Sequence, residues 1–205
     1  MDVLTALQAL PKAPFFFLRH GETDWNRDRL AQGQTDIPLN QAGQDQADQA
    51  RPVLDGHGAV RIITSPLKRA SETAEIVNRT LNLTINRHSG LMERSFGPFE
   101  GKPWVSGFVD SELEGAEPHP QFMERILTTL VEALERPGPP LLVSHGGVFK
   151  IIVELLCTLP DARAANAVPF RFDPPAGSIG DGARWRVSPV DPVRSPDTGS
   201  CWTTP

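Results

Sequence analysis

The stretch FFFLRHGETDWN, residues 15–26, joins four apolar residues directly to two side chains that favour an anion. The apolar run, residues 15–18, has the length and the continuous hydrophobicity of a strand that is covered on both faces. Arg19, His20 and Gly21 follow it without an intervening turn. We therefore expect this strand to end at a place where a negatively charged group can bind.

Three further segments, residues 59–64, 141–144 and 184–190, also have the pattern of strands, and helical patterns lie between them. This alternation predicts an α/β fold built in layers. A chain of 205 residues with 39% hydrophobic content is long enough for one sizeable core. We expect a single domain over residues 1–190, followed over residues 191–205 by a Pro/Ser/Thr-rich tail that is mobile.

Two helices have recognisable start signals. Asn40 is a good N-cap for a helix that starts with the segment QAGQDQADQA. We expect Pro52 to end or kink this helix near Arg51. Ser65 followed by Pro66 predicts the start of a second helix through residues 67–81, because Ser can cap a helix and Pro at its first position loses no hydrogen bond.

Two more helices are predicted in the second half of the chain. Apolar residues recur at helical spacing in residues 120–138, which end in a Pro-Gly stop signal, and another helix begins at Gly146. Residues 95–120 have no periodic pattern and predict a long loop, and such loops often cover a functional site.

Charge and composition restrict the partners. A formal charge of -5 and a pI near 5.5 argue against nucleic acid or an acidic membrane surface, so any anion site must be local. Cys157 and Cys201 are too few for a disulfide framework, which fits a reducing compartment. The chain shows no leader pattern and no apolar run near the ~20 residues that span a bilayer, so we expect a cytoplasmic protein. We also expect a monomer or a homodimer.

Three strand ends should meet at one edge of the sheet. The first delivers Arg19 and His20, the second leads to Arg69 in the first turn of a helix, and the third delivers His145 and Gly146 at a helix start. In open α/β sheets, ligands bind outside the carboxyl ends of the parallel strands. Helix N-termini add backbone N–H donors there, and glycines let the backbone approach a ligand closely. The three junctions together predict an oxyanion pocket.

Each junction alone has an ordinary structural explanation. Arg19 and His20 could form surface ion pairs, His145 could be a buried histidine at a capped helix start, and the turn around Arg69 could be a solvated cationic turn. All three explanations would have to hold independently, whereas one anion site accounts for the whole set.

The segments LRHGETDWN, SPLKRASETA, LMERSFGPFEGK and LLVSHGGV resemble, in their order and approximate spacing, the motifs of the histidine phosphatase superfamily. The resemblance covers roughly residues 13–190. It implies a phosphoglycerate mutase-like fold, a three-layer α/β/α sandwich with a mostly parallel central sheet. It also implies that His20 is the nucleophile, that Glu93 is the proton donor and that no metal or other cofactor is needed. The expected phosphate site comprises Arg19, Gly21, Asn26, Arg69, His145 and Gly146.

The residue types suit this chemistry. A neutral imidazole is a competent nucleophile for phosphorus, and covalent capture divides one difficult hydrolysis into two easier steps. Two nearby guanidinium groups should hold the pKa of His20 down and keep it neutral. Planar guanidinium groups can also bind two phosphate oxygens each.

Three functions are compatible with the pattern. Hydrolysis of small phosphate monoesters is favoured over phosphoglycerate mutase activity, because the loop after Glu93 carries five acids and, between Arg94 and Arg125, only one base, Lys102. An acidic cover would repel a multiply charged substrate. A non-catalytic phosphate-binding domain is the third possibility, and it would not need both His20 and Glu93. The acids of the predicted cover are Glu100, Asp110, Glu112, Glu114 and Glu117.

Other residues receive structural assignments. We expect His57, between two glycines, to lie in a turn, and His88 and His119 to face solvent. Trp25 and Trp104 either line the mouth of the pocket or support its packing.

Overall fold

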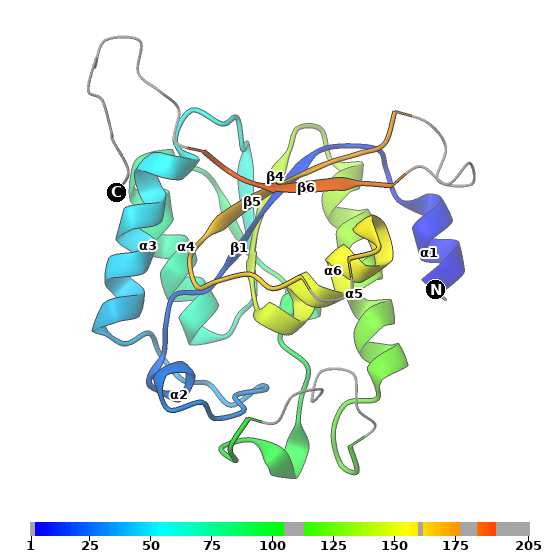
Figure 1. The fold of residues 1–205 in the computed structure, drawn as a ribbon. Coiled ribbons are helices and arrows are strands. Elements are labelled where there is room, and N and C mark those ends of the chain that lie inside the picture. Colours follow the sequence, from blue (N-terminus) through cyan, green and yellow to red (C-terminus); the bar gives the residue numbers. More distant parts are fainter. Residues whose placement is uncertain (1–2, 105–112, 160–161, 177–183, 192–205) are drawn as a thin grey trace, which may run out of the picture.

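The computed structural model describes residues 3–104, 113–159, 162–176 and 184–191, and these form a three-layer α/β/α sandwich (Figure 1). The central sheet has the strand order β3-β2-β4-β1-β5-β6. The first four strands in this order are parallel, whereas β5 runs antiparallel to both β1 and β6. The predicted mostly parallel sheet is therefore confirmed. The strands are β1 (Phe15–Arg19), β2 (Arg61–Thr64), β3 (Ile85–Arg87), β4 (Pro140–Ser144), β5 (Pro169–Asp173) and β6 (Arg186–Pro189).

Helices cover both faces of the sheet. In Figure 1, α3 and α4 lie on one side of it and α1, α5 and α6 on the other. Short 3-10 turns, η1 (Ser89–Leu91) and η2 (Gly97–Phe99), interrupt the long connection before α5. No helix in the described ranges is both long and apolar enough to cross a membrane. The helices are α1 (Val3–Ala9), α2 (Asp24–Arg27), α3 (Gln41–Leu54), α4 (Lys68–Leu81), α5 (His119–Glu135) and α6 (Gly146–Cys157).

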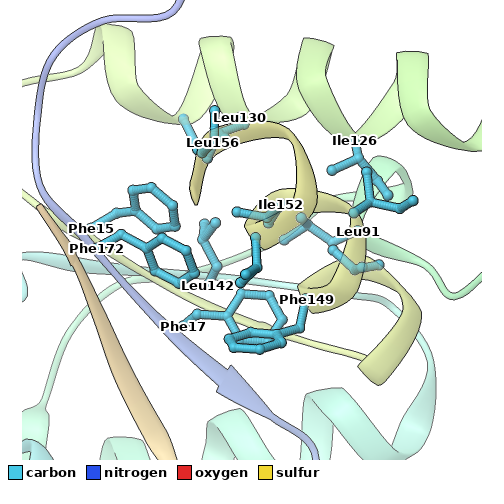
Figure 2. Close-up of a cluster of buried hydrophobic side chains, with 14 of the residues drawn as sticks. Phe15, Phe17, Leu91, Ile126, Leu130, Leu142, Phe149, Ile152, Leu156 and Phe172 are labelled. Carbon is cyan, nitrogen blue, oxygen red and sulfur yellow. The ribbon is translucent and has the colours of Figure 1, made fainter. Parts of the chain in front are cut away.

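Strand β1 is buried on both faces, as its continuous apolar run predicts. Successive side chains of a strand point to opposite faces, so Phe15 and Phe17 pack into the cluster beneath α5 and α6 (Figure 2). Phe16 and Leu18 pack into a second cluster with residues of α3 and α4. In the first cluster the rings of Phe15 and Phe172 stack with centroids 4.5 Å apart. The two cores hold the end of β1 firmly in the middle of the sheet.

The predicted start of α4 is wrong by two residues. The helix begins at Lys68, after the N-cap Leu67, and Pro66 lies outside it. The hydroxyl of Ser65 accepts a hydrogen bond from the N–H of Leu67 at 3.3 Å but does not cap the helix. The side chain of Asp36 takes over part of that task by accepting the N–H of Lys68 at 2.7 Å. Ser65 is thereby left to interact with a histidine of the candidate site, described below.

The prediction that Pro52 ends α3 is also wrong. Helix α3 is capped by Asn40, as expected, but continues through Pro52 to Leu54. Proline in a last turn removes a single intrahelical hydrogen bond, and its fixed φ is compatible with a helix. The N–H of Asp55 still reaches the carbonyl of Arg51 at 3.1 Å, so the helix ends three residues later than expected.

Several elements were not predicted from the sequence. Helix α1, the three-residue β3 and the antiparallel β5 are additional to the expected set. Strand β5 reads PFRFD, in which polar and apolar residues alternate, and this differs from the continuous runs that mark the parallel strands. The predicted tail over residues 191–205 lies outside the described residues from residue 192 onward.

Arg61, the first residue of β2, satisfies backbone carbonyls at the end of α5. The last carbonyls of a helix have no intrahelical partner and need another donor. The guanidinium of Arg61 is buried beside them and donates four hydrogen bonds of 2.7 to 3.0 Å. The accepting carbonyls belong to Ala133, Arg136, Pro137 and Gly138.

We predict that Arg61→Met lowers the free energy of unfolding by about 2–3 kcal/mol, because methionine fills the space but leaves buried carbonyls without a donor. Arg87→Met is the matched control. Its ion pair with Glu75, in which both side chains are 56% exposed, should contribute about 0–1 kcal/mol. Urea unfolding of both variants measures the difference, and equal losses would contradict this role of Arg61.

Candidate active site

A cavity of about 790 Å³ opens at the carboxyl ends of β1 and β4. This is the edge of the sheet at which the three junctions were expected to meet. The structure brings most of the predicted residues together there, although Gly21 and His145 are not among the lining residues. The predicted residues that line the cavity are Arg19, His20, Asn26, Arg69, Glu93 and Gly146.

His20 is held in one tautomer. Its Nδ1 lies 2.7 Å from the carbonyl oxygen of Gly21, and because a carbonyl can only accept, Nδ1 carries the proton and donates. In the neutral ring the lone pair is then on Nε2. The backbone of His20 is fixed as well, since its N–H donates to Ser144 and its carbonyl accepts from the side chain of Asn166. Hydrogen bonds to the ring and to the backbone thus fix the position of His20 and leave Nε2 without a proton.

The surroundings of His20 keep it neutral. Burial lowers the pKa of His20 well below its usual value, and the positive charges of Arg69 and Arg19 lower it further. The predicted direction is therefore confirmed. The larger cause, however, is the loss of solvent around a side chain that is 3% exposed, which the sequence motifs do not reveal.

His145 lies directly beside His20. The two ring centroids are 5.2 Å apart, and His145 is fully buried. Its Nε2 is 2.8 Å from the hydroxyl of Ser65, and its Nδ1 has no hydrogen-bond partner among the described residues. If Ser65 donates to Nε2, Nδ1 carries the proton and is a donor. Burial lowers the pKa of His145 well below its usual value, with a further contribution from Arg69.

The two predicted arginines are held by carbonyl groups, and within the described ranges none of their hydrogen-bond partners is a carboxylate. Arg69 donates to the carbonyls of Gly33 and Thr35 at 2.7 and 2.9 Å, and Arg19 donates to that of Ala164 at 2.9 Å. The Nε atoms of both arginines are buried without a partner in the described part of the chain. Burial lowers the pKa of Arg69 to about 10, so it stays charged at neutral pH.

Glu93 is positioned by the start of α6. One carboxylate oxygen accepts the N–H of Gly147 at 2.9 Å, and the other accepts the N–H of Arg94 at 3.0 Å. A Cβ at position 147 would lie 2.3 Å from the nearer of these oxygens, so only glycine fits. At Gly146 the nearest group is the guanidinium of Arg19 at 3.5 Å, which is ordinary contact. The second glycine of the motif therefore makes room for the carboxylate.

Arg125 holds the loop that carries Glu93. Its guanidinium donates to the backbone carbonyls of Gly90, Met92 and Glu93 at 2.7 to 2.9 Å. It also pairs with the carboxylate of Glu117 at 2.6 Å. The sequence analysis did not identify Arg125, because a single basic residue on an amphipathic helix gives no signal for such a role.

The structure does not support the prediction that Gly21 contacts phosphate. Its N–H donates to the hydroxyl of Thr73 at 3.0 Å, and a Cβ on it would lie 2.3 Å from the carbonyl oxygen of Gly43. Gly21 instead allows the chain to pass close to α3. Asn26 does line the cavity, and its Oδ1 accepts from Thr23 in a capping box that fixes the side chain.

The outer walls of the cavity are partly aromatic. Trp25, Phe96 and Trp104 line it, which agrees with the first of the two alternatives given for the tryptophans. His119 also lines it, so the prediction that this residue faces solvent is wrong. Residues 95–104 thus contribute to the site, as a covering loop was expected to do, and residues 105–112 lie outside the described ranges.

The predicted acidic cover is not present in the described part of this loop. The carboxylate of Glu100 accepts backbone N–H groups of Gln34, Thr35 and Phe96, and Glu117 is paired with Arg125. Glu100, Glu114 and Glu117 do not line the cavity. Asp110 and Glu112 lie outside the described residues. The three described acids of the predicted cover therefore do not form part of the cavity wall.

No cluster of three or more histidine, cysteine, aspartate or glutamate side chains in the described ranges is arranged to hold a metal ion. His57 lies in the predicted turn, and its Nε2 is 2.9 Å from the carbonyl of Asp191. The side chain of His88 is 39% exposed, as expected for a residue that faces solvent, and its Nε2 lies 3.2 Å from the carboxylate of Glu132.

We predict that the free energy of unfolding falls as the pH is lowered from about 7.5 to about 5.5. In the native state His20 and His145 stay neutral, because their pKa values are lowered, whereas in the unfolded chain they take up protons near pH ~6.5. Each contributes a loss of about 1.4 kcal/mol for every pH unit below that value. Denaturant unfolding in phosphate-free buffers measures the slope.

The control variants are His20→Gln and His145→Gln. Each removes one titrating group, so each should reduce the slope by about one proton. A slope that both variants leave unchanged would show that other groups cause the pH dependence.

The comparisons with known sequences agree with this geometry. The family described as the histidine phosphatase superfamily (branch 1) matches residues 15–170. The chain is 34% identical over 157 residues to the uncharacterized phosphatase PhoE of Bacillus subtilis (strain 168), covering 74% of the chain and 81% of that relative. It is 34% identical over 161 residues to the probable phosphoglycerate mutase GpmB of Salmonella paratyphi C, covering 71% and 75%.

A solved structure shares the fold and carries a phosphatase name. The mycobacterial glucosyl-3-phosphoglycerate phosphatase in complex with VO3 superposes with a TM-score of 0.71 over 87% of this chain and 98% of its own, at 25% identity. The family match covers more than half of the chain and includes His20, Arg69, Glu93 and His145. The chain belongs to the histidine phosphatase superfamily.

Proposed function

We propose that the protein is a phosphatase that hydrolyses small-molecule phosphate monoesters through a phosphohistidine on His20, without a metal ion. The arrangement of His20 is the main support. Its ring is neutral, its Nδ1 proton is engaged by a carbonyl, and its Nε2 lone pair remains for attack on phosphorus. Arg19 and Arg69 line the same cavity and can bind the non-bridging oxygens of the phosphate.

In the first step, Nε2 of His20 forms a bond to phosphorus while the bond to the leaving oxygen breaks. Glu93, which lines the same cavity, gives its proton to that oxygen, so the product leaves as a neutral alcohol. If Ser65 donates to Nε2 of His145, its Nδ1–H has no partner among the described residues, and we assign to it the role of a further donor to the phosphate, although His145 does not line the cavity itself.

In the second step, the Glu93 carboxylate takes a proton from water, and the water oxygen attacks the phosphohistidine. The bond between phosphorus and nitrogen breaks, inorganic phosphate leaves, and His20 returns to its neutral form. Protonated Glu93 is then ready for the next cycle. The backbone N–H groups of Gly147 and Arg94 hold the carboxylate in one place for both roles.

Phosphoglycerate mutase activity is the second candidate. It is named among the relatives, and the cavity is lined by Arg29, Lys150 and Arg163 in addition to the two central arginines. These cations remove the argument that an acidic cover repels a multiply charged substrate. Hydrolysis is preferred because the described part of the loop after Glu93 contributes no cation to the cavity, and because the cavity is large for phosphoglycerate.

The proposed function predicts release of phosphate from p-nitrophenyl phosphate in the presence of EDTA. His20→Ala should lower the rate by at least a hundredfold, since covalent capture is then impossible. Quenching with alkaline detergent during turnover should trap a phosphoprotein in the wild type, stable in base and labile in acid, and none in the variant. Equal, slow rates of the two proteins would favour a non-catalytic phosphate-binding domain.

Incubation with 3-phosphoglycerate separates hydrolysis from mutase activity. We expect free phosphate and little 2-phosphoglycerate, with or without added 2,3-bisphosphoglycerate. Efficient formation of 2-phosphoglycerate that depends on the bisphosphate would replace our proposal by the second candidate.

We predict that Gly147→Ala lowers kcat by about 10²- to 10⁴-fold, the range expected for the loss of a general acid. The new methyl group would displace the Glu93 carboxylate, with which it would otherwise overlap. The loss should be larger for an alkyl phosphate than for p-nitrophenyl phosphate, because only the poor leaving group depends on protonation. Rates for both substrates, compared with those of Glu93→Gln, measure this.

Gly146→Ala is the matched comparison, because a Cβ there meets only ordinary contacts with Arg19. It should cause a much smaller loss, with no dependence on the leaving group. If the two glycine variants behave alike, Gly147 does not act by making room for Glu93.

A further inference from the structure

The carbonyl oxygen of Gly21 decides which form of His20 is present. A neutral imidazole has one lone pair, and the hydrogen bond of one ring nitrogen determines which nitrogen carries the proton. Nδ1 of His20 lies 2.7 Å from this carbonyl oxygen, so the lone pair is on Nε2. If the carbonyl turned away, the proton could move to Nε2, which would then be unable to attack phosphorus. The orientation of this one carbonyl therefore matters for the reaction.

Gln46 holds the peptide unit to which this carbonyl belongs. The unit joins Gly21 to Glu22, and its N–H, that of Glu22, donates to Oε1 of Gln46 at 2.9 Å. In a planar trans peptide the N–H and the C=O point in opposite directions. An acceptor that holds the N–H on one side thus directs the carbonyl oxygen of Gly21 to the other side, where the ring of His20 lies.

The position of Gln46 is fixed by the contact between α3 and this segment. The N–H of Asn40, the N-cap of α3, donates to the carbonyl of Glu22 at 3.0 Å. At Gly43, in the first turn of the helix, a Cβ would overlap the backbone of Glu22, so the helix touches the chain directly. Gln46 follows about one turn later and is half-buried. Helix α3 therefore holds its side chain next to the N–H of Glu22.

The preceding peptide unit, between His20 and Gly21, is held from both sides. Its N–H donates to Oγ1 of Thr73 at 3.0 Å, and its carbonyl accepts the side-chain amide of Asn166 at 2.9 Å. Thr73 is fully buried on α4, and its hydroxyl donates in turn to the carbonyl of Arg69 at 2.7 Å. The same threonine thus links the backbone of the proposed nucleophile to the helix turn that carries Arg69.

The turn that carries Asn166 is itself tied to β1. The N–H of Ala167 donates to the carbonyl of Arg19 at 3.0 Å, and the carbonyl of Ala164 accepts from the guanidinium of Arg19 at 2.9 Å. Ala167 has a φ of 51°, in the left-handed region that is unfavourable for residues other than glycine. Such a conformation persists only where the surrounding contacts hold it. These contacts place the amide of Asn166 beside His20.

We propose that three side chains outside the cavity keep His20 in its reactive tautomer by holding the two peptide units on either side of Gly21. These positioning residues are Gln46, Thr73 and Asn166, on α3, on α4 and before β5. The inference rests on the proposed function of His20 as the nucleophile. None of the three lines the cavity, so they act through the backbone and not on the substrate. Helices α3 and α4 cover the same face of the sheet (Figure 1).

Nitrogen NMR of the resting protein reports the tautomer directly. In protein that contains isotopically labelled histidine, the shifts of the two ring nitrogens show which one is protonated, and the spectrum of His20→Gln identifies the signals of His20. We expect His20 in the wild type to be neutral at neutral pH, because its pKa lies well below the usual value, and to carry its proton on Nδ1 alone. Gln46→Met should show both tautomers.

Paired variants separate the hydrogen bonds from the packing. Gln46→Met, Thr73→Val and Asn166→Leu keep the approximate size of each side chain and remove its hydrogen bond to the backbone. Each should reduce the Nδ1–H fraction of His20, and kcat/KM for p-nitrophenyl phosphate should fall by about three- to tenfold, since one hydrogen bond contributes about that factor to an equilibrium. Gln46→Glu and Thr73→Ser keep an acceptor oxygen and should behave as the wild type.

The matched controls change similar side chains elsewhere. Gln41→Met, on α3, and Thr80→Val, on α4, remove side-chain hydrogen bonds at the surface and should leave both the tautomer of His20 and the rate unchanged. Arg61→Met should lower the free energy of unfolding through contacts at the other end of β2. It should also leave the tautomer unchanged, so it separates a loss of stability from a loss of position.

The spectra do not require turnover, so this inference and the proposed function can fail separately. If the wild type hydrolyses no phosphate ester but Gln46→Met still shifts the tautomer of His20, the phosphatase proposal fails and the positioning role stands. A wild type in which His20 carries its proton on Nε2 would overturn the inference. So would a Gln46→Met variant with an unaltered tautomer, and because Gln46 is only half-buried, this variant should fold.

Discussion

Buried positive charge without a carboxylate partner is the constraint on which this site depends. Arg19 and Arg69 give their hydrogen bonds to backbone carbonyls, and the Nε atom of each is buried with no partner among the described residues. A buried charge is costly unless it is paired or hydrogen-bonded. Burial lowers the pKa of His20 most, and the two arginine charges lower it further. The same charges attract an oxyanion, so in the proposed reaction they act on both the nucleophile and the phosphate.

The fold supplies the stability that this arrangement requires. Strand β1 lies in the middle of the sheet with both faces buried, and the chain leaves it directly into the site. Around the candidate active site, polar side chains hold the loops in place through hydrogen bonds to the loop backbones. Glu100 accepts N–H groups of the loop whose carbonyls bind Arg69, and Arg125 binds the loop of Glu93. Residues that never touch a substrate therefore determine where the reacting groups lie.

Much of the candidate active site could be predicted from the sequence, because strand ends and helix starts are local signals. The parallel sheet then brings the residues at these ends together. The roles of Ser65, Asn166 and Arg125 could not, since each depends on a partner far away in the chain. The described acids that were expected to cover the cavity do not line it. Glu100 and Glu117 occur in the right loop but turn their carboxylates toward backbone and Arg125, and a sequence does not show where a side chain points.

The segment of Trp25 and that of Trp104 are joined by an isolated bridge between Leu30 and Pro103. Trp25 follows His20 in one stretch of chain, whereas Trp104 comes from a segment that carries neither His20, Arg69 nor His145. In the proposed reaction, substitutions at Trp104 would therefore alter which alcohols are accepted and leave the groups around phosphorus in place. Substrate range and catalytic competence would then be separable traits, and evolution could change the first while conserving the second.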